Sequence, residues 1–307
     1  MKGVAEAPGK VIVSGEHFVV HGAEAVAAAI ERKVRAEATR SDRLLLSAPV
    51  SGPLALGPAR KVVESLYASM GAEPRVSISV SSPLAPGAGL GSSAAAMVAV
   101  AGAASALEGW GLEGMRLAEA GLVGERLVHG NPSGIDTAAS AMGGVIAFRR
   151  GEPPRALRLG SPLALLVVYS GARRSTGALI KRVGEERASH PSLFGGLCEG
   201  ASMVSGLCED ALGDGDARAL GLLMTYSHAV LGRVGASTAA LDGLVDLCLS
   251  LGCLGAKLTG AGGGGSVLAV PPPGRAAAEG VVSKLRSRGY DAFLTRVPAA
   301  GARAWRE

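Results

Sequence analysis

A glycine-rich segment near residue 90 has the composition of a phosphate-binding loop. It consists of Pro86, Gly87, Ala88, Gly89, Leu90, Gly91, Ser92, Ser93 and Ala94. Glycine lets a backbone turn tightly and approach a ligand closely. The Ala-rich run that follows is predicted to be a helix, whose first N–H groups and positive dipole end favour an anion. The loop lacks the Gly-Lys-Ser/Thr ending of a Walker A loop, and its match to the dinucleotide fingerprint is weak alone. A plain turn before a buried helix is the alternative.

A second glycine loop lies far downstream, at Lys257-Leu-Thr-Gly-Ala-Gly-Gly-Gly-Gly-Ser266. Its central residues are Gly260, Ala261, Gly262 and Gly263. Because glycine is costly in conformational entropy, so many in one loop indicate a demand for tight backbone geometry. A hinge or linker is the alternative.

A lysine and an acid–histidine pair stand close together in the N-terminal segment Ala7-Pro-Gly-Lys-Val-Ile-Val-Ser-Gly-Glu-His17. Lys10 enters a predicted strand, and Glu16 and His17 follow just past its end. This combination is unusual for a purely structural segment, although a single lysine is usually solvated. Since Glu16 precedes His17, the HExxH pattern of zinc proteases is absent.

Two carboxylates mark the segment Gly124-Glu-Arg-Leu-Val-His-Gly-Asn-Pro-Ser-Gly-Ile-Asp136. Glu125 falls at the edge of an apolar helical stripe, but Glu119 and Arg126 lie in the same stripe, so periodicity does not single it out. Asp136 follows an Asn-Pro-Ser-Gly turn and by itself is typical of a turn or helix cap.

The elements that must position these residues mix strands and helices without a regular βαβ rhythm, which favours an α+β fold. Ser92 or Ser93 is expected to cap the Ala-rich helix. A break near 151–154 divides the chain into two predicted domains, 1–155 and 156–307. Strands are predicted at 10–14, 76–80, 163–169, 266–270 and 292–297, and further helices at about 112–128, 176–188, 195–212, 216–232, 236–251 and 275–288.

Composition limits the class of protein. The chain has 307 residues, 48% of them hydrophobic and 19% charged, which excludes disorder as its main state. Only 3% are aromatic, and the net charge of +5 is scattered in short groups, so we predict no nucleic-acid partner. No apolar run is long enough to cross a bilayer, and the start does not resemble a signal peptide. Cysteines 198, 208, 248 and 253 lack metal-site spacing and are predicted to be free thiols in a reducing, cytoplasmic setting.

Together, the three motif segments resemble the signature motifs of the GHMP small-molecule kinases, in the same order and from Ala7 to Gly265. The resemblance implies an ATP-dependent kinase with an α+β N-terminal domain, a ferredoxin-like C-terminal domain and an active site in the cleft between them. It places the ATP phosphates on the Pro86–Ala94 loop and a Mg²⁺ cofactor on Ser93 and Glu125. The Lys257–Gly265 loop would form the floor of that cleft.

On the acceptor side, the resemblance places Asp136 against the substrate hydroxyl, as a base or an orienting group, with Lys10 beside it. It also implies that Glu16 and His17 line the acceptor site and that Thr176 closes on it. A carboxylate near a hydroxyl can take its proton, and a neighbouring ammonium favours the charged carboxylate.

Within the superfamily, these segments look most like the branch that phosphorylates mevalonate for isoprenoid biosynthesis. Phe18 and His21 depart from that branch, which usually has Ala and Tyr there. Phosphomevalonate or homoserine remains an alternative acceptor. A related decarboxylase is less expected because that branch departs from the Gly-Glu-His segment, and a non-catalytic binding protein would be expected to lose Lys10 or Asp136. The expected partners are ATP and the acceptor, with no nucleic acid and no membrane, and a homodimer stays open.

Overall fold

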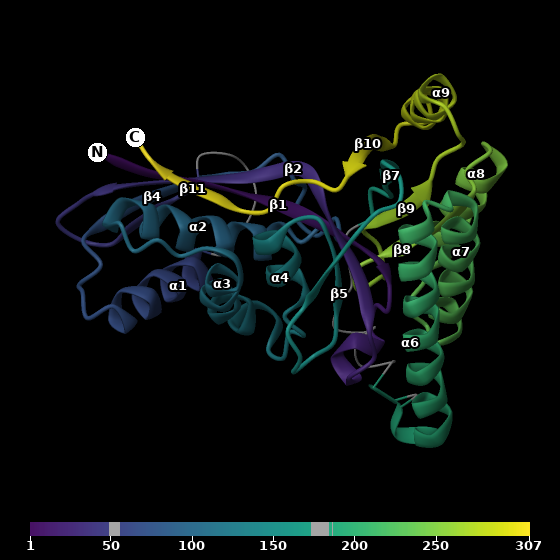
Figure 1. The fold of residues 1–307 in the computed structure, drawn as a ribbon, viewed down its shortest axis with the longest axis horizontal. Helices are drawn as coiled ribbons and strands as arrows, with labels where there is room; N and C mark the ends of the chain where they lie inside the picture. The colour runs from purple at the N-terminus through teal and green to yellow at the C-terminus, as the bar shows by residue number, and fades with distance from the viewer. Residues whose placement is uncertain (49–55, 173–183, 186) are drawn as a thin grey trace.

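The computed structural model describes residues 1–48, 56–172, 184–185 and 187–307. Two sheets organise the chain, and helices pack against each of them (Figure 1). This arrangement confirms the predicted α+β class. It also explains why the strands and helices alternate irregularly along the sequence, since many neighbours in each sheet are distant in the chain.

The first sheet has seven strands and is built on two long antiparallel strands, β1 (Lys2–Ser14) and β2 (Ala25–Arg40). Both are rich in Val and Ala, which fill the buried positions of the sheet. The shorter strands are β3 (Leu45–Ser47), β4 (Val76–Ser81), β5 (Val145–Phe148), β6 (Arg155–Leu157) and β11 (Arg303–Arg306). Because β11 pairs antiparallel with β1, the two ends of the chain lie side by side (Figure 1). The division after residue 155 stays a prediction, and β11 adds a strand from the end of the chain to the first sheet.

A bulge in β1 brings Lys10 to the glycine-rich loop. The strand begins at Lys2 rather than at residue 10, and its register against β2 shifts between Pro8 and Lys10. Bulges accommodate Pro and Gly, which weaken a regular strand. A Cβ on Gly9 would lie 2.8 Å from the Leu90 carbonyl oxygen, so glycine is needed for this close approach. The Lys10 backbone N–H then donates to the same carbonyl at 2.9 Å.

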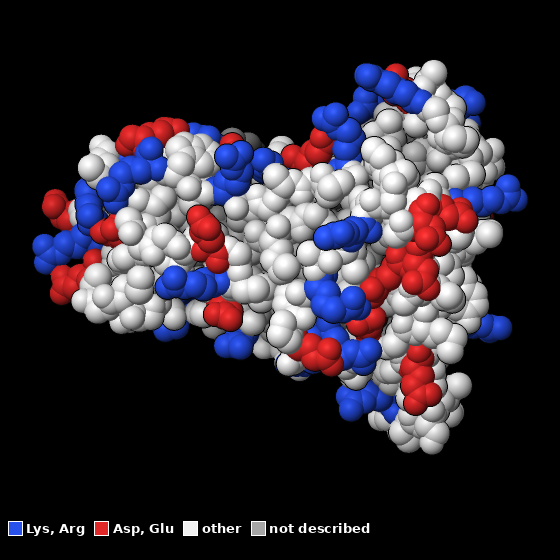
Figure 2. Space-filling model, viewed as in Figure 1, with Lys and Arg blue, Asp and Glu red and all other residues white. Residues whose placement is uncertain are grey.

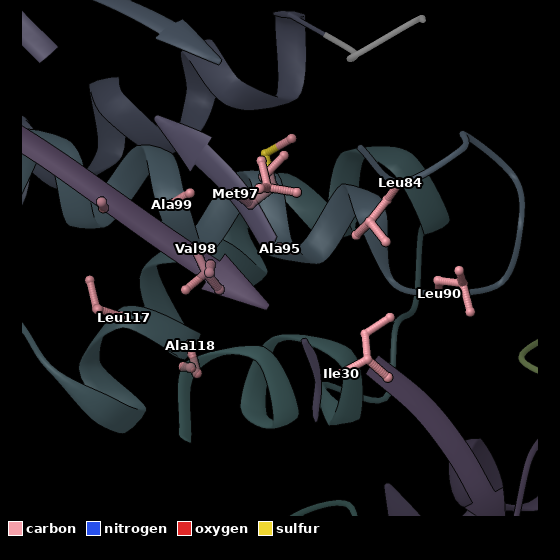
Figure 3. Close-up of a cluster of buried hydrophobic side chains, with 14 of the residues drawn as sticks. Ile30, Leu84, Leu90, Ala95, Met97, Val98, Ala99, Leu117 and Ala118 are labelled. Carbon is pink, nitrogen blue, oxygen red and sulfur yellow. The ribbon is translucent and has the colours of Figure 1, made fainter. Parts of the chain in front are cut away.

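The Ala-rich helix α2 forms the core of this part of the molecule. It is buried almost all round, between the first sheet and α3, because small side chains let backbones approach closely. A Cβ on Gly102 of α2 would lie 2.9 Å from the Cβ of Ala5 in β1. Figure 3 shows Val98 of α2 in the same apolar cluster as Leu117 and Ala118 of α3. The helices here are α1 (Leu56–Ser69), α2 (Ser92–Glu108), α3 (Gly114–His129) and α4 (Ile135–Met142).

The second sheet is antiparallel, with strand order β10–β7–β9–β8. Its strands are β7 (Leu163–Tyr169), β8 (Gly255–Thr259), β9 (Ser266–Val270) and β10 (Asp291–Val297). Its helices are α6 (Pro191–Asp214), α7 (Ala217–Arg233), α8 (Ala239–Ser250) and α9 (Arg275–Arg286). Helices α7 and α8 pack against β8 and β9, and α9 packs against β10.

The predicted elements of this half are confirmed with small shifts at their ends, and two points differ. Residues 257–259 were expected in a loop but belong to β8, which the sequence did not reveal because Lys257 interrupts its apolar pattern. Helix α8 begins at Ala239 rather than at 236, since the Thr238 hydroxyl caps it by accepting from Leu241 N–H. Most of the predicted helical stretch 176–188 lies outside the described residues.

The surface carries both signs of charge. On the face drawn in Figure 2, separate groups of Lys and Arg and of Asp and Glu occur on both parts of the molecule. Among the described residues, no helix has the length and apolarity that a membrane span requires.

Candidate active site

A cavity of about 480 Å³ gathers residues from both parts of the chain. It is lined by the end of β1 and the adjoining η1 (Phe18–His21), the glycine-rich loop with the start of α2, the end of α3, the turn into α4 and the loop after β8. The predicted site residues that line it are Lys10, Glu16, His17, Pro86, Gly87, Gly89, Gly91, Ser92, Ser93, Ala94, Glu125, Asp136, Gly260 and Ala261. Motifs separated by most of the chain therefore converge on one site.

Lys10 and Asp136 meet in this cavity, with Lys10 Nζ 3.1 Å from Asp136 Oδ1. The lysine is buried, whereas the Asp136 side chain is 34% exposed, so one partner of the pair remains accessible from the cavity. Lys10 Nζ also donates to the Gly89 carbonyl at 3.4 Å. Gly91 leaves room for the lysine stem, because a Cβ there would lie 2.9 Å from Lys10 Cγ. The bulge in β1 and the start of α4 thus place a cation and a carboxylate together.

The glycine-rich loop has the backbone that its composition predicts. Gly87, Gly89 and Gly91 have φ values of 75°, 88° and 67°, in the region that L side chains rarely adopt. The expected serine cap is wrong: Gly91 occupies the N-cap position of α2 with no side-chain cap, because the Ser93 hydroxyl donates to Glu125 instead. The first turn of α2 therefore has no side chain at its N-cap, which suits an anionic ligand.

Glu125 is almost fully buried although periodicity did not distinguish it. Its pKa is raised to about 7: burial and the Asp136 charge raise it, whereas the Ser93 hydrogen bond and the Lys10 charge lower it. His129 Nε2 lies 3.6 Å from its second carboxylate oxygen. A buried carboxylate with a raised pKa gains from a cation, and a hydroxyl plus a carboxylate fits Mg²⁺, which takes oxygen ligands and keeps several waters. Ser93 and Glu125 therefore fit the expected metal.

Glu16 lies at the wall of the cavity in a buried ion pair with Lys257 of β8. Both side chains are essentially inaccessible to solvent. Burial raises the pKa of Glu16 and lowers that of Lys257, and each charge opposes the shift of the other. The carboxyl group of Glu16 therefore lies near Lys10 but is shielded from bulk water.

His17 ties the acceptor motif to the second glycine loop. Its Nε2–H donates to the Ala261 carbonyl at 2.9 Å. His17 is also the one non-glycine residue of the described chain with a positive φ, 62°. Such backbone conformations persist where the surroundings enforce them, and they often occur at functional sites.

Phe18 and His21, the two departures from the expected motif, do not line the large cavity. Phe18 is buried 5.9 Å from the ring of Phe194 in α6, and His21 meets the same ring edge-on at 5.0 Å. Burial and nearby arginines lower the pKa of His21. Both residues therefore belong to the packing of η1 against α6 rather than to the wall of the cavity.

The second glycine loop reaches the cavity with Gly260 and Ala261 only. Gly262 lies behind them, where a Cβ would be 2.0 Å from the Ala236 carbonyl oxygen, and Gly263 N–H donates to that carbonyl at 3.1 Å. Similarly, Ala88 and Leu90 of the first loop are buried rather than facing the cavity. These residues shape the two loops rather than their ligand-facing surfaces.

Two contacts of β8 were not foreseen from the sequence. The Thr259 hydroxyl accepts from Ile12 N–H at 2.8 Å, and Lys257 is the partner of Glu16. A lysine between the apolar residues Ala256 and Leu258 was the available signal, because a lysine in a buried strand needs a partner. Thr176, expected to close on the acceptor, lies outside the described residues.

Comparison with known proteins agrees with this geometry. The model for the GHMP kinases N terminal domain matches residues 58–144, and that for the GHMP kinases C terminal domain matches residues 203–291. A mevalonate kinase from Aeropyrum pernix is 37% identical, covering 97% of this chain and 97% of that protein. One from Pyrococcus furiosus is 33% identical over 98% of both. The crystal structure of L. major mevalonate kinase in complex with R-mevalonate superposes with a TM-score of 0.83, at 29% identity and over 96% of both chains.

Proposed function

The chain belongs to the mevalonate kinase family, a branch of the GHMP kinases, and we infer that it transfers the γ-phosphoryl group of ATP to the primary hydroxyl of mevalonate. The product is 5-phosphomevalonate, an intermediate of isoprenoid biosynthesis. The single observation that carries the residue assignment is the Lys10–Asp136 pair in a cavity bordered by the glycine-rich loop.

We propose that the nucleotide phosphates lie along the Pro86–Ala94 loop, at the start of α2. The positive-φ glycines let backbone N–H groups face the phosphates, and the helix N-terminus favours their charge. Ser93 and Glu125 hold the Mg²⁺ in this proposal. Bound there, Mg²⁺ would supply positive charge that neutralises the negative charge developing during transfer.

On the acceptor side, Asp136 accepts the proton of the mevalonate hydroxyl in this proposal. The freed oxygen forms a bond to the γ-phosphorus, and the bond between that phosphorus and the β–γ bridging oxygen breaks, which releases ADP. Lys10 Nζ lies 3.1 Å from Asp136 Oδ1 and holds the carboxylate in place. Phosphoryl transfer depends mainly on positioning and charge neutralisation, and this pair supplies both.

Glu16 and His17 are proposed to bind the acceptor, and Thr176 to close on it. Glu16 and His17 line the cavity on the β1 side, next to Lys10. We also propose a cytoplasmic location, where ATP is available and the four free cysteines would stay reduced.

An assay of ATP consumption with mevalonate, phosphomevalonate and homoserine side by side tests the function. We expect turnover with mevalonate and not with the other two acceptors, and the Asp136→Asn variant controls for contaminating ATPase. Equal or greater turnover of phosphomevalonate would overturn the assignment of the acceptor.

A further inference from the structure

The ammonium group of Lys257 is fully satisfied inside the protein. A lysine ammonium has three N–H donors. Lys257 Nζ donates to a carboxylate oxygen of Glu16, to the Leu258 carbonyl at 2.8 Å and to the Ile12 carbonyl at 3.5 Å. Two of these three acceptors belong to β1 and the segment after it. Lys257, a side chain of the second sheet, therefore links β8 to the N-terminal segment that contains Glu16.

Glu16 is satisfied on one side only. Its Oε2 is the one buried side-chain polar atom without a hydrogen-bond partner in the described chain. Leaving a buried acceptor unpaired is unfavourable, and such atoms in a native protein require an explanation. Glu16 lines the catalytic cavity as well as a smaller one of about 130 Å³ against α6 and α7. Because Lys257 holds Oε1, Oε2 is the oxygen that would accept a hydrogen bond from an acceptor hydroxyl bound against Glu16.

The charges around Glu16 make Lys257 its main counterion. Lys257 of β8 and Lys10 of β1 both favour the ionised carboxylate, and Lys257 has the larger effect. Lys10 already forms an ion pair with Asp136. From α6, the Cys208 thiol faces the pair, but burial raises its pKa to about 11, so it remains uncharged. Removing Lys257 leaves Glu16 buried with no dedicated cation.

We propose that Lys257 is a positioning residue for acceptor binding: it holds the Glu16 carboxylate ionised and oriented, so that Glu16 can accept a hydrogen bond from the acceptor. This inference rests on the proposed function, because it requires an acceptor bound beside Glu16. It also gives a physical role to a lysine of the second glycine motif that does not itself line the cavity.

The test combines Lys257→Met, Glu16→Gln and the double variant in steady-state kinetics. Lys257→Met is expected to raise the KM for mevalonate about 10- to 100-fold, the value of one hydrogen bond to a charged group, with little change in the KM for ATP. Without the lysine, Glu16 ionises at higher pH, so the mevalonate KM of Lys257→Met should fall as pH rises, more steeply than in wild type. In the Glu16→Gln background, Lys257→Met should not raise the KM for mevalonate further.

Two control variants separate positioning from stability. Thr259→Val removes a neighbouring contact from β8 to β1 without touching Glu16, and it should lower Tm without steepening the pH dependence of the mevalonate KM. Lys284→Met makes the same chemical change at an exposed position of α9 and should leave kinetics unchanged. If Lys257→Met does not fold, the comparison of Glu16→Gln with the double variant still decides, because the double replaces the ion pair with two neutral groups.

Several results would overturn the inference. One is an equal increase in the KM for ATP and for mevalonate in Lys257→Met. The others are a pH profile of that variant parallel to wild type, or weaker mevalonate binding in the double variant than in Glu16→Gln. Failure of the wild type to turn over mevalonate would instead refute the proposed function. In that case, ¹³C NMR of labelled glutamate carboxyls still tests the pair, since the Glu16 titration midpoint must move to higher pH in Lys257→Met.

Discussion

Replacing Lys10 and Asp136, singly and together, tests whether the two residues act as one catalytic unit. At 3.1 Å, opposite unit charges attract by about 5 kcal/mol for an effective dielectric constant of about 20. Because Asp136 is 34% exposed, water screens this attraction, and we expect about 1–3 kcal/mol to remain. Lys10→Met should therefore slow turnover by about 5- to 150-fold. Asp136→Asn should cost about 10²–10⁴-fold, the usual contribution of a general base.

The double variant distinguishes a unit from two independent residues. Independent effects would multiply to about 10³–10⁶-fold, whereas residues that share one task lose little more together than Asp136→Asn loses alone. Steady-state kcat measured under saturating ATP and mevalonate provides the comparison, with folding checked by circular dichroism. Lys33→Met is the matched control: it removes a lysine of β2 whose Nζ lies 3.6 Å from Glu6 and that does not line the cavity, so kcat should not change. If the single variants are well folded and their losses in kcat simply multiply in the double variant, Lys10 and Asp136 act independently.

Three further predictions concern the metal site, the second loop and the core. Glu125→Gln removes a charge while nearly preserving shape, so turnover should fall and the Mg²⁺ demand rise; an unchanged Mg²⁺ titration would show that Glu125 binds no metal. Gly262→Ala places a Cβ 2.0 Å from a carbonyl oxygen and should lower stability by about 1–3 kcal/mol, whereas Gly243→Ala, in open space on α8, should raise it by about 0.5–1 kcal/mol; equal Tm values would contradict this. Burial lowers the pKa of His228 in the folded state. Below about pH 6.5 the unfolded state therefore binds a proton more readily than the folded state, and the free energy of unfolding decreases as the pH is lowered. His228→Asn, which keeps an acceptor for Leu258 N–H, should flatten that fall in chemical denaturation, and an unchanged pH slope would exclude His228 as its source.

Part of the fold could be predicted because local chemistry determined it. The alternating Val76–Ser81 strand, the apolar strand at 163–169 and the helices of the second half follow from hydrophobic periodicity and turn residues. The glycine-rich loop also followed from composition, since a positive φ at Gly87, Gly89 and Gly91 is a local requirement that few other residues satisfy. The bulge at Pro8-Gly9 was not predicted, because it depends on the close approach of a loop some eighty residues away.

The candidate site divides in the same way. Read alone, the sequence shows which residue types are present, and the resemblance of three motifs to a kinase family implies their roles. Packing between distant segments buries Glu125 while Glu119 of the same helix stays exposed, and it brings the Ser93 hydroxyl to Glu125 instead of to the N-cap of α2. It also brings Lys257 to Glu16 across the two sheets. The physical reason is that burial and ion pairing depend on what the rest of the chain places against a residue, and a one-dimensional pattern does not contain those distances.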